Sequence, residues 1–114
     1  MPLQAHVCAA ESGINHLVRV LAMEWGPDVR VNVISPGPVA GTEGMRRLAR
    51  DEATHDAYFA RIPMRRWAEI GEVAEAAVFL SSASAAYITG AIIDVDGGSQ
   101  LGDASRNSLD KGLA

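Results

Sequence analysis

Apolar residues near the start of the chain recur at helical spacing. Between Gln4 and Trp25 the larger ones are three or four positions apart: Ile14, Leu17, Val18, Leu21, Ala22 and Trp25. Residues at these separations lie on one face of an α-helix. Gly26 and Pro27 follow, a pair that ends helices. The pattern predicts an amphipathic helix over residues 4–25.

The pattern changes to alternation after Pro27. Every second residue is a valine: Val29, Val31 and Val33. The residues between and after them are Arg30, Asn32 and Ile34. A period of two is typical of a β-strand. Pro36-Gly37-Pro38 must end it, because proline lacks the N–H that a sheet requires. The sequence therefore predicts a strand over Val29 to Ser35.

The second half of the chain repeats this order with an insertion. Gly41 to Arg61 is charged and alanine-rich, which favours two short surface helices. A longer helical period follows around Val73, Ala76, Ala77 and Leu80, and it ends near Ser81 and Ser82. Ala91 to Val95 is a short apolar run bounded by glycines, which predicts a second strand, buried in the protein.

The order of helix, strand, helical insert, helix and strand is typical of the C-terminal part of a doubly wound, Rossmann-like α/β fold. The connection between the strands is long enough for a right-handed crossover that makes them parallel. Two strands are too few to cover two long amphipathic helices. We therefore expect residues 1–98 to be part of a domain whose first strand has an open edge. The polar, weakly patterned residues 99–114 are expected to be a flexible tail.

Composition narrows the classes of function. Hydrophobic residues make up 48% of the chain and charged residues 21%, as in ordinary globular proteins. The net charge of -4 leaves no basic stripe, so we expect no nucleic-acid partner. No apolar window reaches the length of a membrane span, so no membrane partner is expected. The single cysteine, Cys8, favours a reducing, cytoplasmic location.

Five short motifs make the sequence more specific. In chain order they are Leu21 to Gly26, Arg30 to Asn32, Pro36 to Val39, Tyr87 to Gly90 and Val95 to Gly98. Their spacing resembles that of the short-chain dehydrogenase/reductase family, across residues 4–98. Within that family, Leu3 to His6 and Gly41 to Leu48 are most similar to the 2,4-dienoyl-CoA reductases of the peroxisomal type and their bacterial relatives.

This resemblance implies hydride transfer with NADP or NAD, an enoyl-CoA-type substrate and a homo-oligomer. In the family, backbone groups after the Pro-Gly and a nearby threonine hold the carboxamide of the nicotinamide ring. The matching residues are Pro36, Gly37, Pro38, Val39 and Thr42. The same loop is also consistent with a strand terminator that binds no ligand.

The chain departs from the family at the positions that carry catalysis. The glycine-rich turn that binds the pyrophosphate is absent from the sequence. The family's catalytic tyrosine falls at Val7 and its lysine at Glu11. A lysine holds the ribose and lowers the pKa of the proton donor, whereas a carboxylate has the opposite charge. We therefore assign no catalytic residue and expect a C-terminal segment that is inactive by itself.

Two other interpretations remain open. The helix over residues 4–25 belongs to the segment that pairs subunits in the family, so the chain could be a non-catalytic subunit that docks on a full-length homologue. Alternatively, the reading frame is truncated and the cofactor-binding half is encoded upstream. A glycine-rich strand–turn–helix signature in the preceding DNA would favour the latter.

Several other residues have a plain structural interpretation. His6, His16 and His55 share no spacing, so no metal site is assigned. Asp96-Gly97-Gly98 is typical of a strand exit that needs positive φ angles. Six arginines between positions 46 and 66 could meet the phosphates of coenzyme A or form a solvated surface: Arg46, Arg47, Arg50, Arg61, Arg65 and Arg66.

Overall fold

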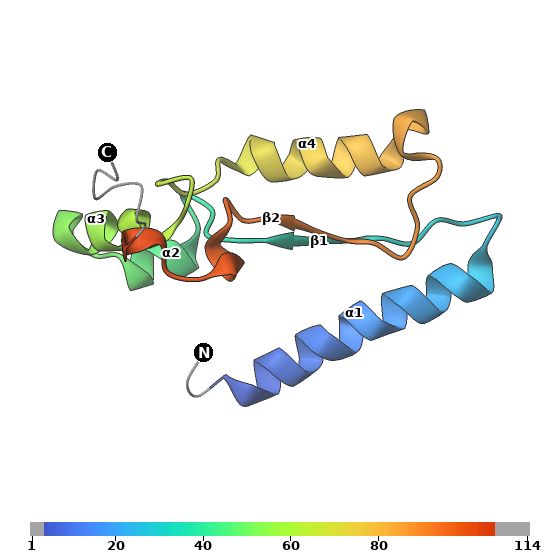
Figure 1. The fold of residues 1–114 in the computed structure, drawn as a ribbon, viewed down its shortest axis with the longest axis horizontal. Coiled ribbons are helices and arrows are strands. Elements are labelled where there is room, and N and C mark those ends of the chain that lie inside the picture. The colour runs from blue at the N-terminus through green and yellow to red at the C-terminus, as the bar shows by residue number, and fades with distance from the viewer. Residues whose placement is uncertain (1–3, 107–114) are drawn as a thin grey trace. The chain divides into compact units, whose positions relative to one another are not determined.

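The computed structural model describes residues 4–106. Within that range it contains four α-helices and two β-strands (Figure 1). In chain order the elements are α1 (Ala5–Trp25), β1 (Val33–Pro36), α2 (Glu43–Leu48), α3 (Glu52–Arg61), α4 (Ile70–Ser81) and β2 (Ile92–Val95). Single 3-10 turns occupy Ala83–Ala85, Ser99–Leu101 and Ala104–Arg106. The predicted order of elements is confirmed.

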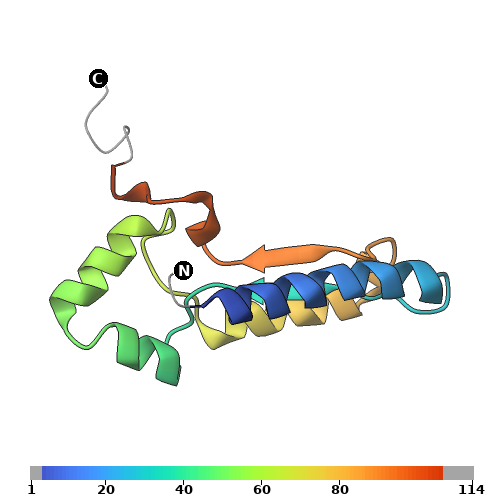
Figure 2. The same cartoon turned by 90° about the horizontal axis from the view of Figure 1, so that it is seen from below.

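The helix ends that the sequence predicts agree with the structure: α1 begins one residue after Gln4, and α4 ends at Ser81. α1 ends at Trp25, directly before Gly26, and the insert consists of the two short helices expected, α2 and α3 (Figure 2). The start of α3 is fixed by Asp51, whose carboxylate accepts the N–H of Thr54 at 2.7 Å. Such a bond satisfies one of the helix's otherwise unpaired N–H groups.

β1 and β2 form a two-stranded parallel sheet. Val33 donates its N–H to the Ala91 carbonyl at 2.9 Å, and Gly37 donates to the Val95 carbonyl at 3.0 Å. Residue numbers rise together along the two strands, which is the parallel arrangement that the sequence predicts. Within the described residues no other strand pairs with β1, so its second edge is open, as expected.

The first strand begins later than predicted, at Val33 instead of Val29. The preceding residues make one backbone bond to the segment before β2, from the Gly90 N–H to the Val31 carbonyl at 2.7 Å, and are otherwise held by side chains. The Val31 N–H donates to the Thr89 hydroxyl at 3.1 Å, and the Asn32 amide donates to the Ile88 carbonyl at 2.9 Å. These polar contacts replace the regular hydrogen-bond pattern that defines a strand.

The prediction that β2 is buried is wrong. Its residues are half-buried, and Asp94 is exposed. A parallel strand becomes buried when helices and further strands cover it on all sides. Two strands cannot supply that cover, so the apolar run Ala91 to Val95 stays partly accessible.

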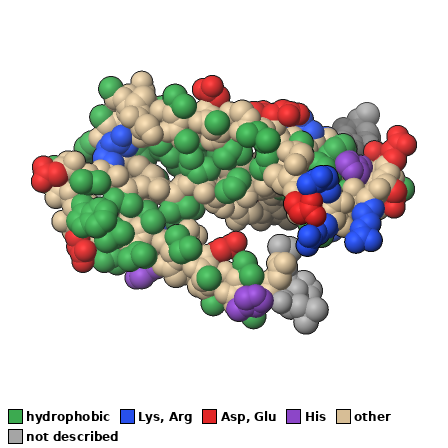
Figure 3. All heavy atoms as spheres, turned by 180° about the vertical axis from the view of Figure 1, so that it is seen from behind, with side chains coloured by type: hydrophobic (Ala, Val, Ile, Leu, Met, Phe, Trp, Pro, Cys, Tyr) green, Lys and Arg blue, Asp and Glu red, His purple; other side chains and the backbone are tan. Residues whose placement is uncertain are grey.

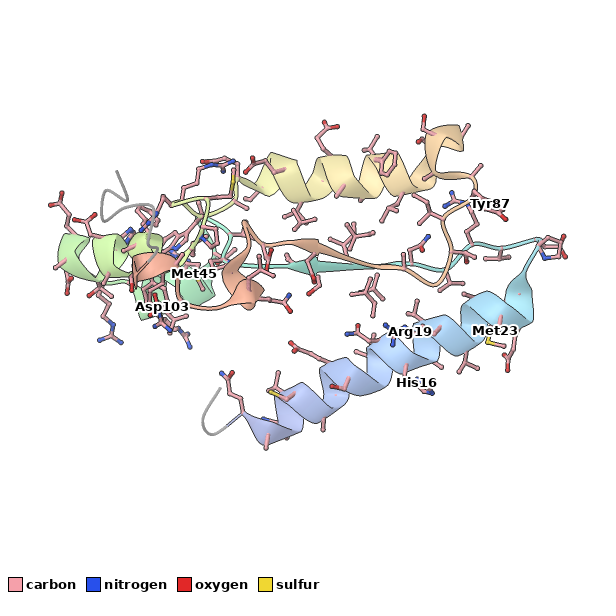
Figure 4. The ribbon with its side chains drawn as sticks, in the orientation of Figure 1. His16, Arg19, Met23, Met45, Tyr87 and Asp103 are labelled. Atoms are coloured by element: carbon pink, nitrogen blue, oxygen red, sulfur yellow. The ribbon has the colours of Figure 1, made fainter. Side chains whose placement is uncertain are left out.

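The first of two compact units contains residues 4–34 and 76–93. Three of its described residues are buried, and two of them are alanines: Ala22, Leu80 and Ala85. Ala22 lies against Gly90, where an added Cβ would be 3.4 Å from the Ala22 Cβ. Much of α1 is exposed, and His16 and Met23 project from it (Figure 4).

The second unit contains residues 35–75 and 94–106. Ala49 and Ile62 are buried within it. Gly97 and Gly98 have φ angles of 62° and 84°, values that residues with a Cβ rarely adopt. This confirms the interpretation of Asp96-Gly97-Gly98 as a strand exit. An added Cβ on Gly98 would also be 2.8 Å from the Pro63 side chain.

The C-terminal segment that we expected to be a flexible tail lies partly outside the described residues. The part that is described forms the two 3-10 turns Ser99–Leu101 and Ala104–Arg106. Asp103 lies between them and pairs with Arg61 of α3 at 3.3 Å. Over residues 4–106, none of the helices combines the length and apolar character needed to span a lipid bilayer.

Candidate cofactor site

The loop after β1 is held in place by Ala68. The Pro38 carbonyl accepts the Ala68 N–H at 2.9 Å, and Ala40 donates its N–H to the Ala68 carbonyl at 2.9 Å. Together these bonds form a parallel bridge between Val39 and Ala68. The backbone on both sides of Val39 is therefore fixed before any ligand binds.

Val39 presents its own polar groups on the side away from Ala68. In a parallel bridge the residue between two bonded neighbours directs its N–H and C=O the other way. The Val39 carbonyl accepts the Thr42 hydroxyl at 3.0 Å. The Val39 N–H has no acceptor within the described residues. Val39 is half-buried as a residue, and a ligand carbonyl would satisfy this N–H.

Thr42 connects this loop to α2. Its hydroxyl donates to Val39 and also accepts the Met45 N–H at 3.4 Å, a long bond that caps the helix. With its proton committed to Val39, the Thr42 oxygen can accept a further hydrogen bond. Val39 and Thr42 therefore offer one donor and one acceptor side by side, which matches the two polar groups of a carboxamide.

Pro36, Gly37 and Pro38 shape the start of the loop. Gly37 lies against Asp96, which follows β2. Burial raises the pKa of the Asp96 carboxyl, but hydrogen bonds from the N–H groups of Gln100 and Gly98 outweigh this effect and hold the pKa below its ordinary value. Asp96 is therefore an ionised group engaged by the turn that follows β2.

The two positions of the missing catalytic pair lie on α1. Val7 and Glu11 are one turn apart and exposed, in the first unit, whereas the loop after β1 belongs to the second. Glu11 makes no ion pair with any described residue. Its assignment as a departure from the family pattern stays a prediction.

An aromatic cluster beside the loop was not anticipated. His55, Phe59 and Trp67 pack together, with ring centroids 4.6 Å apart for His55 and Trp67 and 5.5 Å apart for Phe59 and Trp67. The spacing of four between His55 and Phe59 is a signal that sequence reasoning could have used. Trp67 follows α3 and the turn after it, so no helical spacing relates it to His55 or Phe59. His55 also contacts the Ala49 carbonyl at 3.0 Å, so it is a packing residue.

Basic side chains lie among acidic ones on the face shown in Figure 3. Arg46 and Arg47 both pair with Glu43, at 2.6 and 2.8 Å. Arg66 pairs with Glu72 through two short bonds, of 2.6 and 2.7 Å. Most of these arginines are thus engaged by carboxylates, as the interpretation of a solvated surface suggested. No group of three or more possible metal ligands occurs among residues 4–106.

The sequence of this chain is similar to a family model and to curated proteins. A family model described as enoyl-(acyl carrier protein) reductase matches residues 1–100. The peroxisomal 2,4-dienoyl-CoA reductase of Danio rerio is 42% identical over 104 residues, covering 90% of this chain and 35% of the relative. That of Saccharomyces cerevisiae is 42% identical over 99 residues, covering 86% and 34%.

A solved structure of a dehydrogenase is also similar to this chain. The gluconate 5-dehydrogenase of Burkholderia cenocepacia, in complex with NADP and tartrate, matches with a TM-score of 0.77 and 31% identity. The match covers 85% of this chain and 38% of that one. The chain spans about a third of the length of the curated relatives it matches. With its family model, its relatives and its α/β fold in agreement, the chain belongs to the short-chain dehydrogenase/reductase family.

Proposed function

We propose that the loop Pro36 to Thr42 holds the carboxamide of NADP or NAD, in an oxidoreductase that acts on an enoyl-CoA-type substrate. The observation that carries this proposal is the unpaired Val39 N–H beside the Thr42 hydroxyl. The similarity to 2,4-dienoyl-CoA reductases and to a dehydrogenase in complex with NADP supports the choice of substrate and cofactor.

Each residue of the loop has a distinct part in this proposal. The Val39 N–H would donate to the carboxamide oxygen, and the Thr42 oxygen would accept from the carboxamide nitrogen. Pro36, Gly37 and Pro38 set the course of the backbone. Two fixed polar contacts orient a planar amide and so select one face of the ring. When bound, the nicotinamide supplies or accepts the hydride.

We also infer that these 114 residues do not catalyse the reaction by themselves. Val7 has no proton to donate where the family uses a tyrosine. Glu11 places a negative charge where the family's lysine would attract phosphate and stabilise an ionised donor. The sequence has no glycine-rich turn to bind the pyrophosphate, so the loop would supply only part of the binding energy.

The site can be tested by NMR on the 15N-labelled chain. We expect reduced nicotinamide mononucleotide to shift the amide resonance of Val39 in a saturable way at millimolar concentrations, and we expect Thr42→Val to weaken that response. Adenosine 2′,5′-bisphosphate, which lacks the nicotinamide, serves as the control. Equal shifts with both compounds, or no shift at Val39, would contradict the proposal.

The absence of catalysis needs a separate measurement. With 2,4-hexadienoyl-CoA and NADPH or NADH, we expect no decrease in absorbance at the nicotinamide band above the rate without protein. Turnover that depends on Thr42 would overturn the inference of inactivity while supporting the cofactor site. Turnover unaffected by Thr42→Val would count against both.

A second candidate function is that of a docking subunit. Ile14, Leu17 and Trp25 of α1 are 46–55% exposed, which leaves an apolar helix face without cover among the described residues. Such a face fits a second copy of this chain or a full-length homologue. Analytical ultracentrifugation should then show concentration-dependent association that Leu17→Lys abolishes. A monomer at all concentrations would exclude the self-associating form.

A further inference from the structure

The turn after β2 contains the single Asp-Gly pair of the sequence, Asp96-Gly97. In such a pair the amide nitrogen of the glycine can attack the aspartate carboxyl, because glycine has no side chain to obstruct the approach. We propose that Asp96-Gly97 is a site of isoaspartate formation which the folded turn keeps closed, so that this modification marks chains in which the turn has opened. The proposal does not depend on the cofactor site.

The reaction needs only water. The Gly97 nitrogen forms a bond to the Asp96 Cγ, and its proton leaves with the hydroxyl group of the carboxyl as one water molecule. The product is a five-membered succinimide ring. A second water then adds to the former main-chain carbonyl of Asp96, the bond from that carbonyl to the nitrogen breaks, and the nitrogen regains a proton. The main chain now runs through the Asp96 Cβ and Cγ. One water is lost, one is taken up, and no group is oxidised or reduced.

The folded turn holds the Asp96 carboxyl away from this reaction. Its Oδ1 accepts the Gly98 N–H at 2.9 Å. Its Oδ2 accepts the Gln100 N–H at 2.9 Å and the Ser99 hydroxyl at 3.3 Å. Both oxygens are thus bonded to groups beyond Gly97, and turning the carboxyl carbon toward the Gly97 nitrogen would break these bonds.

The ionisation of Asp96 acts in the same direction. Burial raises the pKa of its carboxyl, but the hydrogen bonds of the turn outweigh burial and hold the pKa below its ordinary value. An ionised carboxylate lacks the hydroxyl group that must leave as water. The closed turn therefore restrains both the position and the protonation that the reaction requires.

The surroundings of the turn do not admit the product. Isoaspartate lengthens the main chain by one carbon atom before Gly97. A Cβ added to Gly97 would already lie 3.2 Å from both Ile62 and Met64, and one added to Gly98 would lie 2.8 Å from Pro63. The Gly97 carbonyl also accepts the Met64 N–H at 3.2 Å. A longer main chain would displace Gly97 from these contacts, so isomerisation should hinder the return of an opened chain to the folded state.

The test compares the full chain with a synthetic peptide of residues 92–101, which carries the same Asp-Gly pair without the fold. Both are incubated at the same temperature and neutral pH. Electron-transfer dissociation mass spectrometry measures isoaspartate at position 96, because it cleaves the additional Cα–Cβ bond of the main chain. We expect the peptide to isomerise at least about tenfold faster, since the folded chain reacts only from its open state. Equal rates, or no isoaspartate at position 96 in the peptide, would overturn the proposal.

Two substitutions at Gln100 test whether the turn is the cause. Gln100→Pro removes the N–H that Asp96 accepts, whereas Gln100→Ala keeps that N–H and removes the side-chain bond to Asp94. Gln100→Pro should accelerate isoaspartate formation severalfold, and Gln100→Ala should leave the rate near that of the parent. Circular dichroism verifies that the variants are folded. If Gln100→Pro does not fold, Ser99→Ala, which removes one donor to Asp96, should give a smaller acceleration. Equal rates in the variant that folds and in Gln100→Ala would contradict a protective turn.

The effect on refolding is measured on chains aged in urea and then diluted into buffer. Size-exclusion chromatography separates refolded from aggregated chains, and isoaspartate at position 96 should be enriched in the aggregated fraction. Equal amounts of isoaspartate in the two fractions would show that the turn accepts the longer main chain, against the proposal.

Discussion

A Cβ added to Gly37 would lie 2.7 Å from both the Cα and the Cβ of Asp96. Real Cβ atoms do not approach other carbon atoms so closely, so this contact exists only because residue 37 is glycine. The contact joins the residue after β1 to the residue after β2. It therefore fixes the distance between the two strand ends from which the candidate cofactor loop and the Asp96 turn begin.

Gly37→Ala should destabilise the chain by about 1–3 kcal/mol, the usual cost of forcing extra volume into a packed site. Urea unfolding followed by circular dichroism measures this change. Gly44→Ala is the matched control, because its Cβ would meet nothing within 4 Å and position 44 lies in α2. That variant should be unchanged or more stable by up to about 1 kcal/mol. Equal effects of the two substitutions would refute the steric explanation.

The side chain of Asn32, in the first unit, is expected to stabilise the segment before β2. Its side chain donates to the Ile88 carbonyl at 2.9 Å and accepts the Ala91 N–H at 3.0 Å. Asn32→Ala should leave the Ala91 N–H unpaired and leave the Ile88 carbonyl with only the Arg30 guanidinium, which donates to it at 3.2 Å. The cost should be about 1–3 kcal/mol. Hydrogen exchange of the Ala91 amide should accelerate in Asn32→Ala.

Asn32→Asp is the informative control for that experiment. Aspartate keeps an acceptor for Ala91 but loses the donor to Ile88. Protection of the Ala91 amide should therefore survive in Asn32→Asp, although overall stability falls. If Asn32→Ala left exchange at Ala91 unchanged, the side chain would not be the partner that protects this amide.

The same residues explain what sequence reasoning could and could not find. The alternation from Val29 to Ser35 predicted a strand, and the later start at Val33 results from side-chain bonds to residues almost 60 positions away. Periodicity reports which face of a segment is apolar, but not which distant groups compete for its backbone. The bonds of a helix are local, and the predicted bounds of α1 and the predicted end of α4 are accurate to a residue.

In the candidate site, too, some features could be predicted from the sequence and others depend on contacts between distant residues. Family resemblance pointed to Val39 and Thr42, whereas the unpaired Val39 N–H depends on the bridge to Ala68, which no local pattern reveals. The strand exit at Gly97 and Gly98 was predictable because adjacent glycines after an apolar run signal positive φ angles.

Asp51 is expected to control the stability of α3. Its carboxylate accepts both the hydroxyl and the N–H of Thr54, and these bonds hold its pKa below the ordinary value. Asp51→Ala should cost about 0.5–2 kcal/mol, and Asp51→Ser, which keeps a capping oxygen, should recover most of that loss. Thermal unfolding compares the three proteins. Equal losses in the alanine and serine variants would show that capping is not the cause.

The last prediction concerns the contribution of Glu72 to stability at low pH. Glu72 accepts two hydrogen bonds from Arg66 and one from the Glu69 N–H, and these lower its pKa from 4.5 to about 2. A carboxyl with a depressed pKa binds its proton less readily in the folded state than in the unfolded state. Its stabilising effect is therefore complete above pH 4.5 and is lost as the pH falls from 4.5 toward 2.

Glu72→Gln should accordingly be less stable than the parent at pH 7, and the difference should shrink steadily between pH 4.5 and pH 2. Urea unfolding at a series of pH values measures both curves, at low salt so that the exposed Arg66 pair is not screened. Glu75→Gln, on the same helix but without an ion pair among the described residues, should follow the parent curve. A difference between Glu72→Gln and the parent that is constant over the whole pH range would mean that the ionised carboxylate contributes nothing to stability.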